Sequence, residues 1–191
     1  MAQRSARDRL LDAASTMFYR DGINATGIDR VIAGAGVAKA SLYNNFASKD
    51  ELIAAYLERH REHFVARLHE LDTLSDPSER LAQFFAGLAR SAREATFAGC
   101  PFAKAAVEVR PDSPAHRVIE RFYGELARFF ARALGAAPDD PAVTQLVVCY
   151  DGALSAARFR RDPSCVAAAA ALAQSILTVR RGEPAAPDAT I

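Results

Sequence analysis

A short segment, residues 38–46, carries side chains whose chemistry suits phosphates and the edges of nucleic-acid bases. Leu42 and Phe46 are four residues apart, a spacing that places both on one face of a helix. The other face offers hydrogen-bond donors, small side chains and one phenol, and it contains no carboxylate. Surfaces that meet phosphates and base edges are built from such groups. The positions concerned are Lys39, Ala40, Ser41, Tyr43, Asn44 and Asn45.

A second short helix is predicted directly before this segment. Residues 28–35 place four apolar side chains on one stripe, and Gly36 follows where the chain must reverse direction with a positive φ. Two short helices joined by a glycine turn are the layout of a helix-turn-helix, whose second helix enters the DNA major groove. Helical bundles that never contact DNA contain similar pairs, so the pattern alone leaves an ordinary solvated helix open.

Two longer helices are expected to hold this pair in place. The first covers about residues 5–21, and Thr26 follows as the expected cap of the next helix. Ser48, followed three residues later by Glu51, forms a capping box that opens a helix over residues 50–71. At about 1.5 Å per residue this helix is roughly 30 Å long. It is therefore long enough to link an N-terminal domain to a C-terminal one.

The rest of the chain also reads as helices, and no segment shows the alternation typical of a strand. The fold class is therefore predicted to be all-α, with about nine helices. We expect a three-helix domain over residues 1–50, a larger helical domain over residues 51–182 and a disordered tail over residues 183–191. The five further helices cover about residues 79–95, 102–109, 115–134, 141–160 and 163–179.

Composition and charge narrow the classes of protein that the chain can be. Hydrophobic residues make up 50% of the chain, enough for an extensive core. The formal net charge is +1, and residues 1–50 hold seven Lys or Arg against five Asp, so any DNA affinity must come from a local surface. Three widely spaced cysteines without a CxxC favour a reducing cytoplasm over a disulfide framework. No apolar run reaches the ~18–20 residues of a membrane span, so we expect a cytoplasmic protein without a membrane segment.

Residues 5–57 resemble the DNA-binding domain of the TetR family of bacterial transcriptional regulators. The resemblance rests on residue types at fixed spacing through both short helices and into the long one, and it is far more specific than a bare helix-turn-helix. Beyond this region, only the helical architecture is similar. The matching residues are Gly22, Thr26, Ile28, Ile32, Ala33, Gly36, Val37, Lys39, Ala40, Ser41, Leu42, Tyr43, Phe46, Ser48, Lys49 and Leu52.

Two positions depart from the pattern of that family. Ala38 stands where the family often has a serine that caps the second helix, and the loss of such a cap costs on the order of 1 kcal/mol. Asn44 stands where a histidine is common in the family. Both changes bear on which operator sequence is bound rather than on whether DNA is bound.

The resemblance implies a ligand-responsive regulator that binds a palindromic operator in double-stranded DNA as a homodimer. Repression is the usual action in the family, and an effector bound in the larger domain releases the protein from DNA. Residues 50–71 would transmit the change. Phosphate contacts are implied for Thr26, Tyr43 and Lys49, and contacts with the groove floor for Lys39, Ala40, Ser41 and Asn44.

Side chains of the larger domain supply candidates for the effector site and for the dimer interface. The last two predicted helices, over residues 141–179, are rich in small residues, which let helices pack closely within the chain or against a second copy. We expect the homodimer to form through them. Aromatic residues indicate a small apolar or aromatic effector, although ordinary core packing is open for each. No cofactor and no metal site is expected. The candidate effector-binding residues are Phe84, Phe85, Cys100, Phe102, Phe122, Tyr123 and Tyr150.

Cys100 raises an alternative mechanism. It precedes Pro101 at a predicted helix start, and a helix N-terminus lowers the pKa of a thiol. The chain could then be a repressor that senses oxidants or electrophiles through this cysteine, whereas packing in the core is the plainer interpretation. A helical enzyme, or an adaptor that binds no DNA, is a further alternative. The sequence contains no GxSxG, no HExxH and no phosphate-binding glycine loop, and we expect no enzymatic activity.

Overall fold

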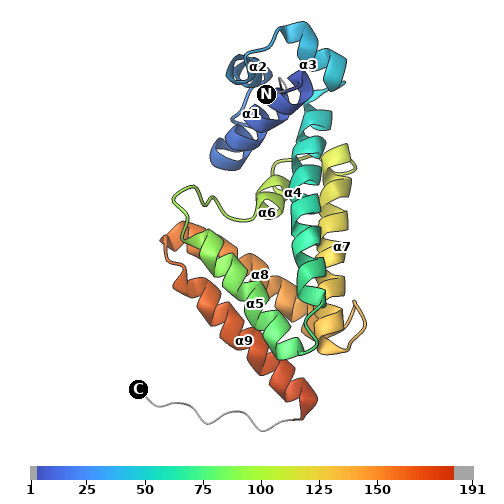
Figure 1. Cartoon of the computed structure of the whole chain (residues 1–191), viewed down its shortest axis with the longest axis vertical. Helices are drawn as coiled ribbons and strands as arrows, with labels where there is room; N and C mark the ends of the chain where they lie inside the picture. Colours follow the sequence, from blue (N-terminus) through green and yellow to red (C-terminus); the bar gives the residue numbers. More distant parts are fainter. Residues whose placement is uncertain (1–3, 183–191) are drawn as a thin grey trace. The chain divides into compact units, whose positions relative to one another are not determined.

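A computed structural model of the chain describes residues 4–182, and this range contains nine α-helices and no strand (Figure 1). The predicted all-α fold class is confirmed. The predicted tail, residues 183–191, lies outside the described residues. Among the helices that the structure describes, none is long and apolar enough to cross a membrane. The helices are α1 Ala6–Asp21, α2 Ile28–Ala35, α3 Lys39–Asn45, α4 Lys49–Asp72, α5 Pro77–Ala92, α6 Pro101–Ala106, α7 Pro114–Leu134, α8 Pro141–Arg160 and α9 Ser164–Arg181.

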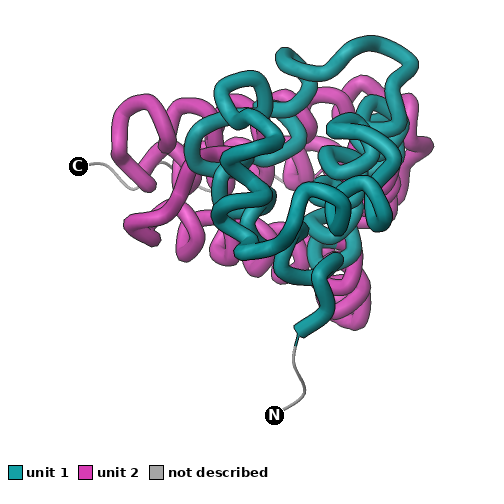
Figure 2. Tube along the Cα trace, turned by 90° about the horizontal axis from the view of Figure 1, so that it is seen from above, with its two compact units in different colours: residues 1–64, 100–122 teal, residues 65–99, 123–191 magenta. Residues whose placement is uncertain are grey.

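The helices form two compact units, which Figure 2 shows in teal and magenta. Unit 1 comprises residues 1–64 and 100–122, and unit 2 comprises residues 65–99 and 123–191. Each unit is therefore built from two separated stretches of the chain. The long helices α4 and α7 each begin in unit 1 and end in unit 2. The predicted domain boundary after residue 50 stays a prediction.

Local sequence signals set the helix ends in unit 1. The Ser5 hydroxyl caps α1 by accepting a hydrogen bond from the Asp8 N–H at 3.1 Å. Gly36 ends α2 in the left-handed conformation, with a φ of 60°, as the turn required. The Ser48 hydroxyl accepts from the Glu51 N–H at 3.2 Å, which is one half of the predicted capping box.

Two predicted details of unit 1 are wrong. Thr26 does not cap α2, because Gly27 occupies the N-cap position and the buried Thr26 hydroxyl donates to the Gly22 carbonyl at 2.8 Å. The helix predicted over residues 102–109 ends at Ala106, because the residues that follow leave it to contact the turn between α1 and α2.

Three polar contacts fix α6 and the segment after it to the helix-turn-helix region of unit 1. A carboxylate oxygen in this segment accepts from a backbone N–H of the turn at 2.7 Å, and an arginine forms an ion pair with the start of α4 at 2.6 Å. A lysine of α6 donates to a backbone carbonyl of α1. The pairs are Glu108 with Asn24, Arg110 with Asp50, and Lys104 with Tyr19.

In unit 2, α5, α8 and α9 pack against one another (Figure 1). Phe84 of α5 lies at the centre of an aromatic cluster, with its ring centroid 5.1 Å from that of Phe129 and 5.2 Å from that of Phe130. The edges are joined by polar contacts: the Ser78 hydroxyl donates to the Gln174 side chain at 2.8 Å, which ties α5 to α9. Unit 2 therefore has a core of its own.

Candidate nucleic-acid interface

The apolar side of α3 is anchored in unit 1, so its polar side is turned outward. Leu42 is fully buried, and Phe46, which follows the helix, is 5% exposed. The Arg7 guanidinium of α1 lies over the Phe46 ring, 5.2 Å from its centroid. Tyr43, the residue after Leu42, keeps 54% of its surface exposed. A helix held in this way presents one fixed face to a partner.

An arginine of α1 holds the turn between α2 and α3. The Arg9 Nη1 group donates to the Gly36 carbonyl at 3.2 Å. This bond fixes the corner from outside the two-helix motif, 27 residues away along the chain. Arg7 and Arg9 are thus positioning residues of the interface, and no sequence pattern indicates them because their partners are distant in sequence.

Five of the seven predicted DNA-contact residues lie on or beside the outward face of α3. Lys39, Ala40, Tyr43 and Asn44 are exposed, and Ser41 is half-buried. The five share one continuous surface because the helix is short and its opposite side is buried. Their contact with DNA stays a prediction.

The other two predicted contact residues are held in the entry to α2 and α4. Thr26 is fully buried. Lys49 is half-buried, and its ammonium group donates to the Ile23 carbonyl at 2.7 Å. Both side chains fix the backbone before α2. Their contact with phosphate stays a prediction, and the burial of the Thr26 hydroxyl argues against a direct contact by that side chain.

The N-terminus of α3 has no side-chain cap. Ala38 occupies the N-cap position, and its methyl group cannot accept a hydrogen bond from the first N–H groups of the helix. The expected loss of the cap at this departure from the family pattern is therefore confirmed.

Acidic side chains neutralise part of the positive charge of α1, α2 and α3. The Lys39 ammonium group lies 3.2 Å from an Asp29 carboxylate oxygen, and both side chains are exposed. Asp21 pairs with Arg20 at 2.6 Å and with Arg30 at 2.7 Å, and the hydrogen bond from Arg20 lowers the pKa of Asp21 to about 2. Exposed pairs of this kind are weak. Lys39 can therefore exchange Asp29 for a phosphate.

The predicted effector-binding residues fall into separate groups. Phe102 and Phe122 stack in unit 1 with their centroids 3.7 Å apart. In unit 2, the Tyr123 hydroxyl donates to an Asp151 carboxylate oxygen at 2.9 Å, while burial raises the pKa of that carboxyl. Effector binding by any of these residues stays a prediction. The remaining aromatic candidates belong to the core of unit 2 and are Phe84, Phe85 and Tyr150.

Cys100 is the N-cap residue of α6. Its sulfur accepts a hydrogen bond from the Ala103 N–H at 3.5 Å, and the residue is 4% exposed. A thiol enclosed in this way meets oxidants in solution poorly, because redox-sensing cysteines need access to solvent. The geometry favours the packing role over the sensor.

The outer sides of α8 and α9 carry exposed apolar residues at regular spacing. They belong to one exposed stripe on each helix, whose members follow at steps of four, three and four residues. The stripe on α8 comprises positions 148, 152, 155 and 159, and the stripe on α9 comprises positions 168, 172, 175 and 179. The large side chains at the ends and middle of these stripes are between 51% and 88% exposed. Each helix therefore presents its large apolar side chains along one exposed stripe rather than as scattered residues. The large members are Val148, Phe159, Leu172 and Val179.

Residues 10–56 match the family model described as bacterial regulatory proteins, tetR family. Among curated proteins, the HTH-type transcriptional repressor KstR2 of Mycobacterium tuberculosis is 37% identical over 82 residues. That match covers 42% of this chain and 41% of the repressor, so the chain spans about two fifths of the curated relative.

Two solved structures are similar over most of the chain. SCO4454, a TetR-family transcriptional regulator from Streptomyces coelicolor, is 27% identical with a TM-score of 0.84, and the similarity covers 91% of this chain and 95% of that one. A putative tetR transcriptional regulator from Streptomyces avermitilis, SAV143, is 33% identical with a TM-score of 0.75, and the similarity covers 90% of this chain and 99% of that one. The similarity therefore includes the helices that follow the helix-turn-helix.

Proposed function

Because the chain belongs to the TetR family of bacterial regulatory proteins and is a helix-turn-helix transcriptional regulator, we propose that it represses transcription by binding a palindromic operator as a homodimer. A small apolar or aromatic effector then releases it from DNA. The observation that carries the DNA-binding part is the anchoring of α3, with Leu42 buried and an outward face free of carboxylates. The relatives are regulators rather than enzymes, which supports a binding role.

The outward face of α3 divides into two kinds of contact. Lys39, Ala40, Ser41 and Asn44 are small or donor-bearing residues that suit the groove floor, where base edges carry the sequence information. Tyr43 suits a phosphate, because its exposed hydroxyl stands at the end of a rigid ring. Lys49 would need to release the Ile23 carbonyl before it could reach a phosphate.

The homodimer that this proposal requires would form through the apolar stripes of α8 and α9. Small residues such as Gly152 and Ser155 separate the large ones on α8, which allows a partner helix to approach closely. A two-fold axis then places two copies of α3 on one operator, and each reads one half-site. Two copies also make more phosphate contacts than one, which matters because a single chain has a formal net charge of only +1.

The effector site that this proposal requires would involve the aromatic residues of unit 2. Phe84 and Tyr150 lie with their centroids 6.1 Å apart, and the Tyr123–Asp151 hydrogen bond is a polar group that could orient a ligand. A mass spectrum of small molecules released from the purified protein by denaturation would identify an effector that co-purifies with it.

Gel-shift titrations with the DNA upstream of the protein's own coding region test the central claim. We expect a retarded complex that survives excess unrelated DNA, and an association constant that falls as salt rises, because phosphate contacts release counterions. The proposal fails if no complex forms at about 50 mM salt, where phosphate contacts are strong.

A further inference from the structure

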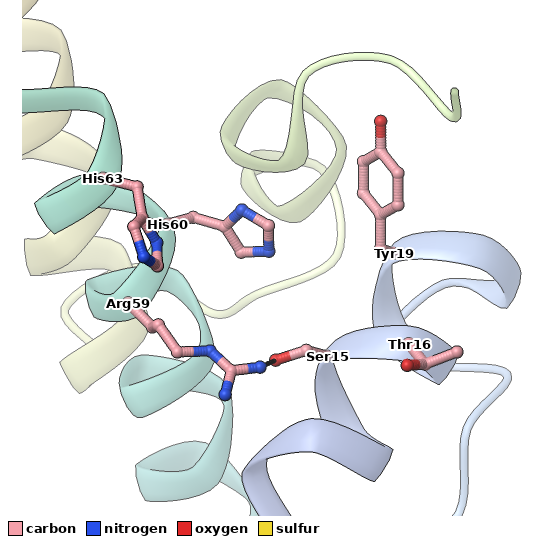
Figure 3. A pocket seen from close by; sticks show the side chains of 6 residues that line it. All are labelled: Ser15, Thr16, Tyr19, Arg59, His60 and His63. Atoms are coloured by element: carbon pink, nitrogen blue, oxygen red, sulfur yellow. Dashed lines mark hydrogen bonds between the residues drawn. The ribbon is translucent and has the colours of Figure 1, made fainter. Parts of the chain in front are cut away.

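Unit 1 contains an open cavity of about 390 Å³ between α1 and α4 (Figure 3). Small-molecule sites commonly measure about 300–1,000 Å³, so the cavity is large enough for a small ligand. No residue that lines it belongs to α3 or to the effector-binding set predicted above. The lining residues are Ser15, Thr16 and Tyr19 of α1 and Arg59, His60 and His63 of α4.

The chemistry of this cavity suits an anion. Every lining residue is polar, and none is a carboxylate. α1 contributes three hydroxyl groups, of which that of Thr16 already donates to the Asp12 carbonyl at 3.0 Å. α4 contributes a guanidinium and two imidazoles, which can donate hydrogen bonds. Asp12 of α1 accepts from Arg59 at 2.6 Å and also pairs with Arg4 at 2.7 Å. Positive charge at the cavity is therefore only partly neutralised.

Arg59 is already held in position for a ligand. Its Nη1 group donates to Asp12, and its Nη2 group donates to the Ser15 hydroxyl at 2.5 Å and to the Leu11 carbonyl at 3.3 Å (Figure 3 shows the bond to Ser15). A guanidinium has five N–H groups, so two remain for another acceptor. Its side chain is 32% exposed. Because the group is fixed before a ligand arrives, little conformational entropy is lost on binding.

Flat rings form the rest of the cavity wall. Figure 3 shows His60 reaching from α4 toward α1, with Tyr19 on the far side. The two ring centroids are 6.1 Å apart and the ring planes differ by 30°. Burial, and then the charges of Arg59 and His63, lowers the pKa of His60 to about 4. Burial is the largest cause, and the smaller contributions come from positive charges at Arg59 and His63, which also attract an anion.

We propose that this cavity binds a small organic anion, a carboxylate carried on a flat ring, and that its occupation weakens DNA binding. The carboxylate accepts from the free N–H groups of Arg59, and the ring lies against Tyr19 and His60. The bound ligand spaces α1 from α4, and α1 supplies the Arg7 and Arg9 contacts that hold α3 and its turn. The effect on DNA rests on the proposed function, whereas the binding itself does not.

The site is tested directly by titrating the full-length protein with benzoate. Binding is measured by isothermal calorimetry and by shifts in the NMR signals of the His60 ring. We expect a dissociation constant on the order of 1 mM, with acetate and inorganic phosphate at least about tenfold weaker. The cavity proposal is overturned if benzoate shifts no signal at about 20 mM, and the flat-ring part is overturned if phosphate or acetate binds as tightly.

Two variants and a matched control locate the bound benzoate. Arg59→Gln is expected to weaken binding at least about tenfold, because the carboxylate loses its charged partner. Arg67→Gln removes another exposed arginine of α4 that does not line the cavity, and it should leave binding unchanged. If Arg59→Gln does not fold, Tyr19→Leu removes the ring wall and should weaken benzoate about threefold or more. Equal binding by wild type and the cavity variant that folds would overturn the assignment.

Gel shifts with and without saturating benzoate test the regulatory half. Occupation of the cavity should weaken operator binding at least about threefold in the wild type and not in Arg59→Gln. Unchanged operator affinity in the benzoate-bound protein would overturn this half. Benzoate binding by a protein that binds no operator supports the cavity site and contradicts only the proposed function. Operator binding without benzoate binding contradicts only the cavity site.

Discussion

Arg9 and Lys49 both donate to backbone carbonyls of the helix-turn-helix region. Arg9 holds Gly36, in the turn before α3, and Lys49 holds Ile23, before α2. A count of charges over residues 1–50 would assign both cations to DNA, yet each is occupied inside the protein. The charge available to phosphate is therefore smaller than the sequence suggests, and the fixed geometry of α3 becomes more important for affinity.

Replacement of Tyr43 by alanine should weaken binding to every operator sequence by about the same factor. A phosphate contact carries no sequence information, so its loss of roughly 1 kcal/mol, about fivefold in affinity, is shared by all sites. Gel shifts on a panel of operator variants measure this. Tyr43→Phe, which keeps the ring, should show the same uniform loss. A changed order of preference among the operators would contradict the phosphate assignment.

His60 should make the folded protein less stable as the pH falls from about 6.5 to 4. Its pKa in the folded state is about 4, below the ordinary value of 6.5, so the unfolded chain binds the proton more readily in this range. The free energy of unfolding should decrease by about 2–3 kcal/mol across the window. Urea denaturation at several pH values compares wild type with His60→Phe.

In His60→Phe this part of the pH dependence should disappear, because the phenyl ring keeps the contact with Tyr56 and cannot titrate. His69→Gln, on the exposed side of the same helix, serves as the control and should retain the wild-type slope. Equal slopes in all three proteins would show that His60 is not protonated on unfolding.

At the scale of whole elements, the local signals were sufficient for most helices. Apolar periodicity and a terminal glycine placed α2 at residues 28–35, and a leading proline placed α8 at 141–160, which is where both lie. The end of α6 could not be predicted, because Glu108 leaves the helix to bind Asn24, 84 residues away. The same holds for the cavity, since Ser15 and Arg59 meet across 44 residues. Contacts at such separations leave no periodic pattern in a single sequence.

A serine at position 38 should stabilise α3. Ala38→Ser supplies an oxygen that accepts from a free N–H group at the start of the helix, a contribution of about 1 kcal/mol. Thermal unfolding followed by circular dichroism should show a midpoint higher by roughly 2–4 °C. The control is Ala40→Ser, at the second residue of the same helix. This variant should not raise the midpoint of thermal unfolding. Equal effects of both serines would contradict the capping explanation.

At the scale of the whole molecule, the proposed regulator requires two chains. One copy of α3 is only seven residues long and has few cations free for phosphate. The exposed stripes on α8 and α9 supply a surface through which a second copy can be held. A substitution that disrupts this surface should therefore reduce dimer formation and operator affinity together.

A charge at the C-terminal end of the apolar stripe on α8 should separate the dimer. Phe159 is 88% exposed in the single chain, and Phe159→Glu would bury a carboxylate in the proposed interface. Light scattering coupled to gel filtration should show a monomer, and operator affinity should fall at least about tenfold. Val107→Glu alters an equally exposed residue, 86%, outside the stripes and should remain dimeric. A dimeric Phe159→Glu protein would place the interface elsewhere.

The discontinuity of unit 1 has a consequence for synthesis on the ribosome. The contacts of Glu108, Lys104 and Arg110 with the helix-turn-helix region cannot form until their segment has emerged, long after α1 to α3. At about 5–20 residues per second, residues 65–122 add several seconds during which a nascent helix-turn-helix lacks these partners. A nascent chain on the ribosome therefore passes through a period in which α3 exists before the contacts that support it.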